Sequence, residues 1–171
     1  MVSEDVRDGI IDLIKILDKG IAMKHHVQDF YRHASEKIRS VHGRKMFDWL
    51  VEFKANHEQK LREKRKELLE HPALEGFKPP PIDMDKLLSE VSLNTILPAN
   101  PTDVDILHLA MENEERAFAF FTRKSTHSHY EHIKTMFETM AAEEEKHIKI
   151  LTDIRRRLQI EGVWGDYKDM E

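Results

Sequence analysis

The chain has 171 residues, 40% of them hydrophobic and 35% charged, with a formal net charge of −5. This length supports one ordinary domain with its own core, and a content of only six Gly and six Pro favours an all-helical protein. The negative charge argues against a dedicated nucleic-acid surface. The absence of cysteine excludes disulfides, thiolate metal sites and cysteine nucleophiles.

The N-terminal stretch MVSEDVRDGI is acidic and polar, which is unlike a secretion signal. Apolar runs also stay well short of the roughly eighteen residues that a membrane span needs. The sequence therefore predicts a cytoplasmic protein that does not interact with a membrane.

Apolar residues that recur at steps of three and four predict two long helices in the first half, over about residues 4–39 and 45–70. The first apolar face includes Leu13, Leu17 and Tyr31, and the second includes Phe47 and Leu50. A turn in SVHGRK joins the two helices, and Gly43 is expected to stop the first one.

Residues 71–101 interrupt the helical pattern. Pro72, Gly76 and the run Pro79 to Pro81 exclude a continuous helix, although DMDKLLSEV favours a short one. A connection of this length is too long for a hairpin between neighbouring helices. It suits a crossover that runs along a helical bundle, as in ferritin-like folds.

Two more helices are predicted in the second half, over about residues 102–124 and 130–160. Thr102 with an acid three residues later is the signature of a helix N-cap. The tail that follows is expected to end in a loose terminus, with Trp164 docked on the protein.

The second half repeats the first at an offset of 90 residues. Among the residues that coincide are Leu17 with Leu107, Tyr31 with Phe121, Phe47 with Phe137, Leu50 with Met140 and His57 with His147. Two helical hairpins with one pattern, joined by a crossover, predict a single-domain four-helix bundle with pseudo-twofold symmetry.

The apolar faces have gaps at equivalent positions, and these gaps hold charged residues. They are Lys24 and Lys54 in the first half, and Glu114 and Glu144 in the second. His57 and His147 follow Lys54 and Glu144 by one helical turn on the same faces. The predicted core therefore contains a cluster of Lys, Glu and His, which is costly to bury unless the charges are paired or bind a metal.

Residues 8–160 resemble the rubrerythrin branch of the ferritin-like superfamily. The segments that carry the resemblance are LAMENEERAFAFF and FETMAAEEEKHIKIL, with VQDFYRHA and MFDWLVEFKANHEQKL as their counterparts in the first half. In that family, each hairpin supplies one Glu from its first helix and a Glu-x-x-His motif from its second to a di-iron site. The resemblance implies that Glu114, Glu144, His147 and His57 occupy ligand positions.

The chain departs from this pattern at two positions. Where the family has two further glutamates, this chain has Lys24 and Lys54. Protonated lysine has no lone pair for a metal ion, and two ammonium groups already balance two carboxylates. We therefore expect a degenerate site without a cofactor, in which Lys24 and Lys54 pair with Glu114 and Glu144. Tyr31, seven residues after Lys24 on the same face, is a candidate hydrogen-bond partner.

Two other arrangements remain open. One is a single Fe, Mn or Zn ion held by Glu114, Glu144 and His147, with or without His57. The other is a dinuclear site that draws on His25 or His26. His129 and His132, one turn apart, are a weaker surface candidate.

The resemblance also implies an oxidoreductase that handles peroxide or dioxygen. However, the chain departs from the ligand set and lacks the cysteines that a rubredoxin module needs. Both observations favour a structural or interaction module instead. We expect this module to be a homodimer. A small-ligand or proton-handling role for the Lys–Glu–His cluster is a further alternative.

Overall fold

The computed structural model describes residues 3–91 and 95–164, which are all-α, as predicted. Five α-helices and one 3₁₀ turn make up the regular structure of these residues. They are α1 (Glu4–Lys37), α2 (Val41–Leu69), the 3₁₀ turn Pro72–Leu74, α3 (Met84–Glu90), α4 (Asp103–Thr126) and α5 (Glu131–Glu161). None of the helices in these residues is long and apolar enough to cross a membrane.

The chain divides into two compact units, residues 1–26 with 53–94 and residues 27–52 with 95–171. The helices α1 and α2 each contribute one part to the first unit and one part to the second. Each unit is described by itself below.

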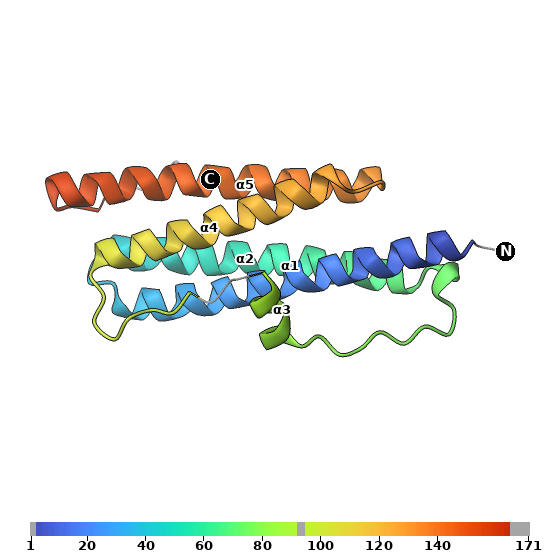
Figure 1. Ribbon diagram of the computed structural model, residues 1–171. Helices are drawn as coiled ribbons and strands as arrows, with labels where there is room; N and C mark the ends of the chain where they lie inside the picture. Colours follow the sequence, from blue (N-terminus) through green and yellow to red (C-terminus); the bar gives the residue numbers. More distant parts are fainter. Residues whose placement is uncertain (1–2, 92–94, 165–171) are drawn as a thin grey trace. The chain divides into compact units, whose positions relative to one another are not determined.

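The first unit contains the beginning of α1, the end of α2 and the short α3 (Figure 1). Its α1 and α2 segments are joined by an ion pair between Asp18 and Arg65, whose side chains are 13% and 16% exposed. Lys19 of α1 pairs with Glu90 of α3 at 3.3 Å, so α3 is held against α1. The apolar core of this unit includes Leu17, Ile21 and Leu61, which are fully buried.

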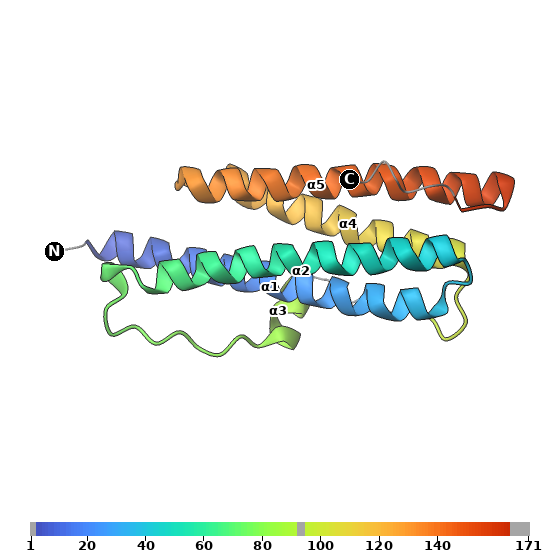
Figure 2. The ribbon, with the colours of Figure 1, turned by 180° about the vertical axis from the view of Figure 1, so that it is seen from behind.

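The second unit brings four helical segments together. The helices α4 and α5 lie side by side, as both views show (Figures 1 and 2). The α1 and α2 segments are joined by an edge-to-face contact between Tyr31 and Phe47 and by a hydrogen bond of 2.6 Å from Ser35 to Asp48. Phe121 of α4 packs on Phe137 of α5, with ring centroids 5.6 Å apart.

The helix ends of the second unit follow from local sequence. Thr102 and Asp105 form a capping box at the start of α4, as the N-cap signature predicted. The hydrogen bond from the Thr102 backbone N–H holds the pKa of Asp105 below its ordinary value. The helix α5 ends at Glu161 and is followed by Gly162, which adopts the left-handed conformation (φ 70°) and donates its N–H to the carbonyl of Leu158.

The expected role of Gly43 as the stop of the first helix is wrong. The helix α1 ends at Lys37, and α2 already begins at Val41, so Gly43 lies in the first turn of α2. A Cβ at Gly43 would lie 2.7 Å from Cγ2 of Ile38 and 2.8 Å from Cζ2 of Trp164. The glycine is therefore explained by close packing, because it makes room for the indole ring.

Trp164 docks on the second unit, as the sequence predicted, while the expected loose terminus after it lies outside the described residues. Its indole N–H donates to Oδ2 of Asp103 at 2.9 Å. Its ring stands edge-to-face to Phe47 with the centroids 6.4 Å apart.

We expect Gly43→Ala to displace Trp164 from this position. Adding a methyl group where no room exists costs about 1–3 kcal/mol, and the displaced indole should become more exposed to water. The measurement is urea unfolding together with tryptophan emission, in a Trp49→Phe background so that Trp164 alone reports. Lys45→Ala, at an exposed position of the same helix, is the control. Unchanged emission and stability in Gly43→Ala would contradict this account of the glycine.

Candidate metal centre

Three potential metal ligands converge between α4 and α5 in the second unit. Glu114 comes from α4, whereas Glu144 and His147 come from α5, where a spacing of three places them on one helix face. Each offers one ligand atom, and these atoms lie within 4.8 Å of one another. The residues are 1%, 0% and 2% exposed, so water does not solvate the two carboxylates.

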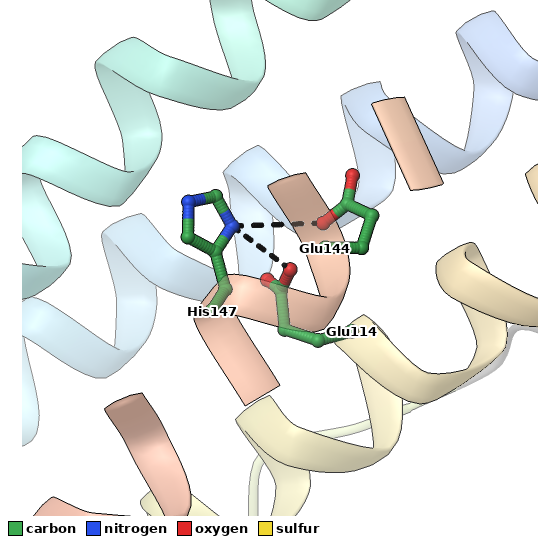
Figure 3. Close-up of side chains that lie close together, drawn as sticks. All are labelled: Glu114, Glu144 and His147. Carbon is green, nitrogen blue, oxygen red and sulfur yellow. Dashed lines mark hydrogen bonds and ion pairs between the residues drawn. The ribbon is translucent and has the colours of Figure 1, made fainter. Parts of the chain in front are cut away.

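The imidazole of His147 points one nitrogen at both carboxylates (Figure 3). Its Nδ1 lies 3.3 Å from Oε2 of Glu114 and 3.7 Å from Oε2 of Glu144. A proton on Nδ1 would be donated to Glu114, and a lone pair on the same atom would face any ion held between the carboxylates. The geometry therefore fits either a hydrogen-bonded cluster or a single metal ion.

Tyr31 donates a hydrogen bond to Glu114. Its hydroxyl donates to Oε1, the carboxylate oxygen that does not face His147. Burial raises the pKa of Tyr31 well above its ordinary value of 10.0, and the charge of Glu114 and the hydrogen bond between them act in the same direction. Tyr31 is therefore a neutral hydrogen-bond donor at physiological pH.

Lys24, Lys54 and His57 lie in the first unit, and each is 1% exposed. The Lys54 ammonium is 5.9 Å from the centroid of the Phe53 ring, and the imidazole of His57 stands edge-to-face to the same ring at 4.6 Å. Two fully buried lysines on the apolar faces of α1 and α2 are unusual, because burying an ammonium group is costly unless an anion compensates its charge.

The remaining histidines named from the sequence lie closer to the surface. His25 is half exposed, with Nδ1 3.5 Å from Glu58, and His26 is partly buried. His129 and His132 are exposed.

Two residues near the cluster were not identified from the sequence. Trp49 of α2 stands edge-to-face to the His147 ring, with the centroids 5.6 Å apart. Asn113, directly before Glu114, is fully buried and accepts a hydrogen bond of 2.7 Å from Thr95. Asn113 lies three residues after the buried Ala110, so the helical period could have identified it, whereas Trp49 is off the apolar face of α2 and gave no such signal.

The donor set bears on which metals would fit. Two carboxylates and an imidazole suit one Fe, Mn or Zn ion and leave coordination positions for other ligands. The di-iron centre of the superfamily needs four carboxylates and two histidines. The residues of this chain do not supply that set, because Lys24 and Lys54 stand at the two positions where the sequence resemblance implies carboxylates, and a protonated lysine has no lone pair for a cation.

Comparisons with known proteins agree with the fold. Residues 105–166, which include Glu114, Glu144 and His147, match the sequence profile of the rubrerythrin family. No curated protein matches the sequence.

Two solved structures are similar. One is the dodecameric thioferritin, a bacterioferritin-related protein from Bacteroides fragilis, with a TM-score of 0.68 and 17% identity over 88% of this chain and 90% of that one. The other is a hypothetical protein from Pyrococcus furiosus, with a TM-score of 0.63 and 19% identity over 86% and 90% of the two chains. At these identities the likeness shows the fold. The chain therefore has a ferritin-like fold and matches the rubrerythrin family over residues 105–166, so the resemblance predicted from the sequence is confirmed.

We expect Tyr31→Phe to destabilise the protein by about 1.5–3 kcal/mol, the usual contribution of a hydrogen bond to a charged group. The substitution keeps the ring against Phe47 but removes the hydrogen bond from the Tyr31 hydroxyl to Oε1 of Glu114. Urea unfolding at neutral pH measures the loss. Tyr130→Phe, at a partly exposed position, is the control and should change little.

The raised pKa of Tyr31 also predicts a pH dependence. The phenol ionises near pH 10.0 in the unfolded chain but only at higher pH in the folded protein. Its contribution to stability is therefore fully present below pH 10.0 and is lost as the pH rises from there towards the folded-state pKa. Above pH 10.0 the unfolding free energy of the unsubstituted protein should fall more steeply than that of Tyr31→Phe, and parallel curves would contradict this.

Proposed function

We propose that the protein is a rubrerythrin-like helical bundle with a degenerate di-iron site, serving as a structural or interaction module without the peroxidase activity typical of the family. In this proposal Lys24 and Lys54 replace two carboxylate ligands and pair with Glu114 and Glu144. The two ammonium groups take over the charge-balancing role that two metal ions have in the superfamily.

The observation that carries this proposal is the burial of both lysines. Each side chain is 1% exposed, and each stands where the family pattern has a carboxylate. A buried ammonium group is costly unless an anion compensates its charge, and a buried carboxylate is costly unless a cation compensates its charge. Two lysines and two glutamates satisfy both requirements without a cofactor.

Peroxide consumption in the presence of a chemical reductant tests the proposal that the protein lacks peroxidase activity. The unsubstituted protein is expected to consume no more peroxide than a Glu114→Gln/Glu144→Gln variant, in which both carboxylates are lost. A rate that saturates with peroxide and disappears in this variant would contradict the proposal.

The second candidate is an oxidoreductase that uses one metal ion, and it is favoured by the convergence of three ligand atoms within 4.8 Å. Glu114, Glu144 and His147 would hold the ion, which would supply redox or Lewis-acid chemistry at its open positions. His147→Ala then lowers the affinity for Fe(II) or Mn(II) in a direct binding titration. Equal and weak binding by both proteins argues against this candidate.

Self-association as a homodimer is part of the same proposal. The thioferritin from Bacteroides fragilis is described as dodecameric. In the second unit of this chain, Val41, Ile96, Ile160 and Val163 are large apolar residues that are more than half exposed. Light scattering on the purified protein distinguishes a dimer from a monomer or a dodecamer, and either of the latter contradicts the dimer.

A further inference from the structure

A pocket of about 480 Å³ lies in the first unit, between α1 and the segment that leads into α3. Its volume falls within the usual range of small-molecule sites, roughly 300–1,000 Å³. The surface of the pocket is mostly apolar, and the apolar residues that line it are Pro80, Pro81, Ile82 and Leu87. None of the residues that line the pocket belongs to the candidate metal centre.

The apolar wall follows from the proline run of the crossover. Because consecutive prolines cannot continue a helix, residues 77–83 have no helical structure, and α3 begins only at Met84 (Figure 1). Proline also has no backbone N–H that needs a hydrogen-bond partner. An apolar ligand can therefore cover Pro80 and Pro81 without burying an unsatisfied backbone donor.

All three acidic residues that line the pocket already have partners. Asp18 of α1 forms an ion pair with Arg65 of α2. Glu90 of α3 pairs with Lys19 of α1 at 3.3 Å. Asp83 is the N-cap of α3 and accepts a hydrogen bond of 3.1 Å from a backbone N–H of its first turn. These contacts hold the walls of the pocket together, and they compensate the negative charges that would otherwise repel an anion.

Two lysines of the lining are available to a ligand. Lys86 is exposed and makes no ion pair with the residues that the structure describes. Lys15 pairs with Asp12 at 3.0 Å, but the two side chains are 67% and 69% exposed, and such a surface pair contributes little. An anion can therefore approach both ammonium groups without breaking a buried ion pair. The pocket thus combines an apolar wall with positive charge where it meets water.

We infer that this pocket binds a small amphiphilic carboxylate, a molecule with an apolar chain and a single negative charge. The chain lies against Pro80, Pro81 and Leu87, and the carboxylate faces Lys15 and Lys86. A single charge suits two exposed lysines that stand beside three acids, whereas a doubly charged group would be repelled more strongly by those acids. The inference goes beyond the proposed function and does not depend on it, because neither the buried lysines nor a metal ion takes part.

The experiment titrates the full chain with decanoate, below its micelle concentration, by isothermal titration calorimetry. Decylammonium has the same chain with the opposite charge, and hexanoate has the same head group with four fewer methylene groups. We expect one saturable decanoate site per chain and about tenfold weaker binding of decylammonium. Hexanoate should also bind at least about tenfold more weakly, because each buried methylene group contributes about fourfold in affinity.

Lys15→Gln/Lys86→Gln should lower the affinity for decanoate about tenfold, because it removes both ammonium groups of the site. Lys60→Gln/Lys66→Gln is the matched control, since it removes two exposed lysines of the same unit that do not line the pocket. The control changes the net charge equally and should leave the affinity unchanged. Circular dichroism establishes that both variants are folded.

Three results would overturn the inference. The first is the absence of saturable decanoate binding by the unsubstituted protein. The second is an equal affinity for decylammonium or for hexanoate, which would mean that the head group or the chain is not recognised. The third is a loss of affinity in Lys60→Gln/Lys66→Gln as large as that in Lys15→Gln/Lys86→Gln.

Discussion

The double variant Lys24→Glu/Lys54→Glu is expected to bind two divalent metal ions per chain, the stoichiometry of the superfamily's ligand set. The substitutions put carboxylates at the two positions where the resemblance implies them, so that, with Glu114, Glu144, His57 and His147, the chain has all the residue types of that set. The reason is chemical: a carboxylate supplies lone pairs and negative charge, whereas a protonated lysine supplies neither. Metal content is measured by mass spectrometry after the purified protein has been exposed to Fe(II) or Mn(II).

A Lys24→Gln/Lys54→Gln variant is the control for this experiment, because glutamine removes the positive charges without adding carboxylates. It should bind no more than a single ion. The Glu variant is also expected to gain thermal stability when metal is added, since an ion that binds only the folded state stabilises it. A Glu variant that folds but binds no more metal than the Gln variant would contradict this expectation. It would show that positions 24 and 54, assigned from the 90-residue repeat, are not metal-ligand positions.

Lys54→Met is expected to lower the free energy of unfolding by about 3–5 kcal/mol, the cost of leaving one member of a buried ion pair uncompensated. Methionine fills nearly the same volume as lysine, so the loss reports charge compensation more than packing. Urea unfolding at neutral pH measures the effect. Lys60→Met, at an exposed position of the same helix, should change stability by no more than about 0.5 kcal/mol.

If Lys54 compensates the charge of Glu144, the double variant Lys54→Met/Glu144→Gln tests the pairing directly. Removing both charges should cost less than the two single substitutions together, because neither partner is left alone. If Lys54→Met leaves stability unchanged or raises it, the lysine does not compensate a buried carboxylate. The single-metal candidate predicts that outcome, since removing a cation near an ion relieves repulsion.

Most of the fold follows from local sequence. The helical period of the apolar residues predicted the four long helices, and the short helix α3 lies in the segment DMDKLLSEV that favoured one. Thr102 and Asp105 identified the start of α4 because a capping box needs only four consecutive residues. Gly43 was misinterpreted because its neighbour Trp164 is far away in the sequence, and no local pattern reports such a contact.

The candidate site could be located in part. Comparison of the two halves identified Glu114, Glu144 and His147, and the structure places them together. Tyr31 lies on the predicted face, and its hydroxyl does reach Glu114. Trp49 could not be found, because an aromatic residue beside the apolar face of a helix is common and its contact with His147 depends on how α2 and α5 pack.

The most direct test of the degenerate site is the metal content of the unsubstituted protein, purified without added metal and analysed by mass spectrometry. Lys24 and Lys54, each 1% exposed, are proposed to take the place of the two ions. The metal content should therefore lie far below one ion per chain, for iron, manganese and zinc alike. One tightly bound ion per chain would contradict the metal-free site and establish the single-metal candidate instead.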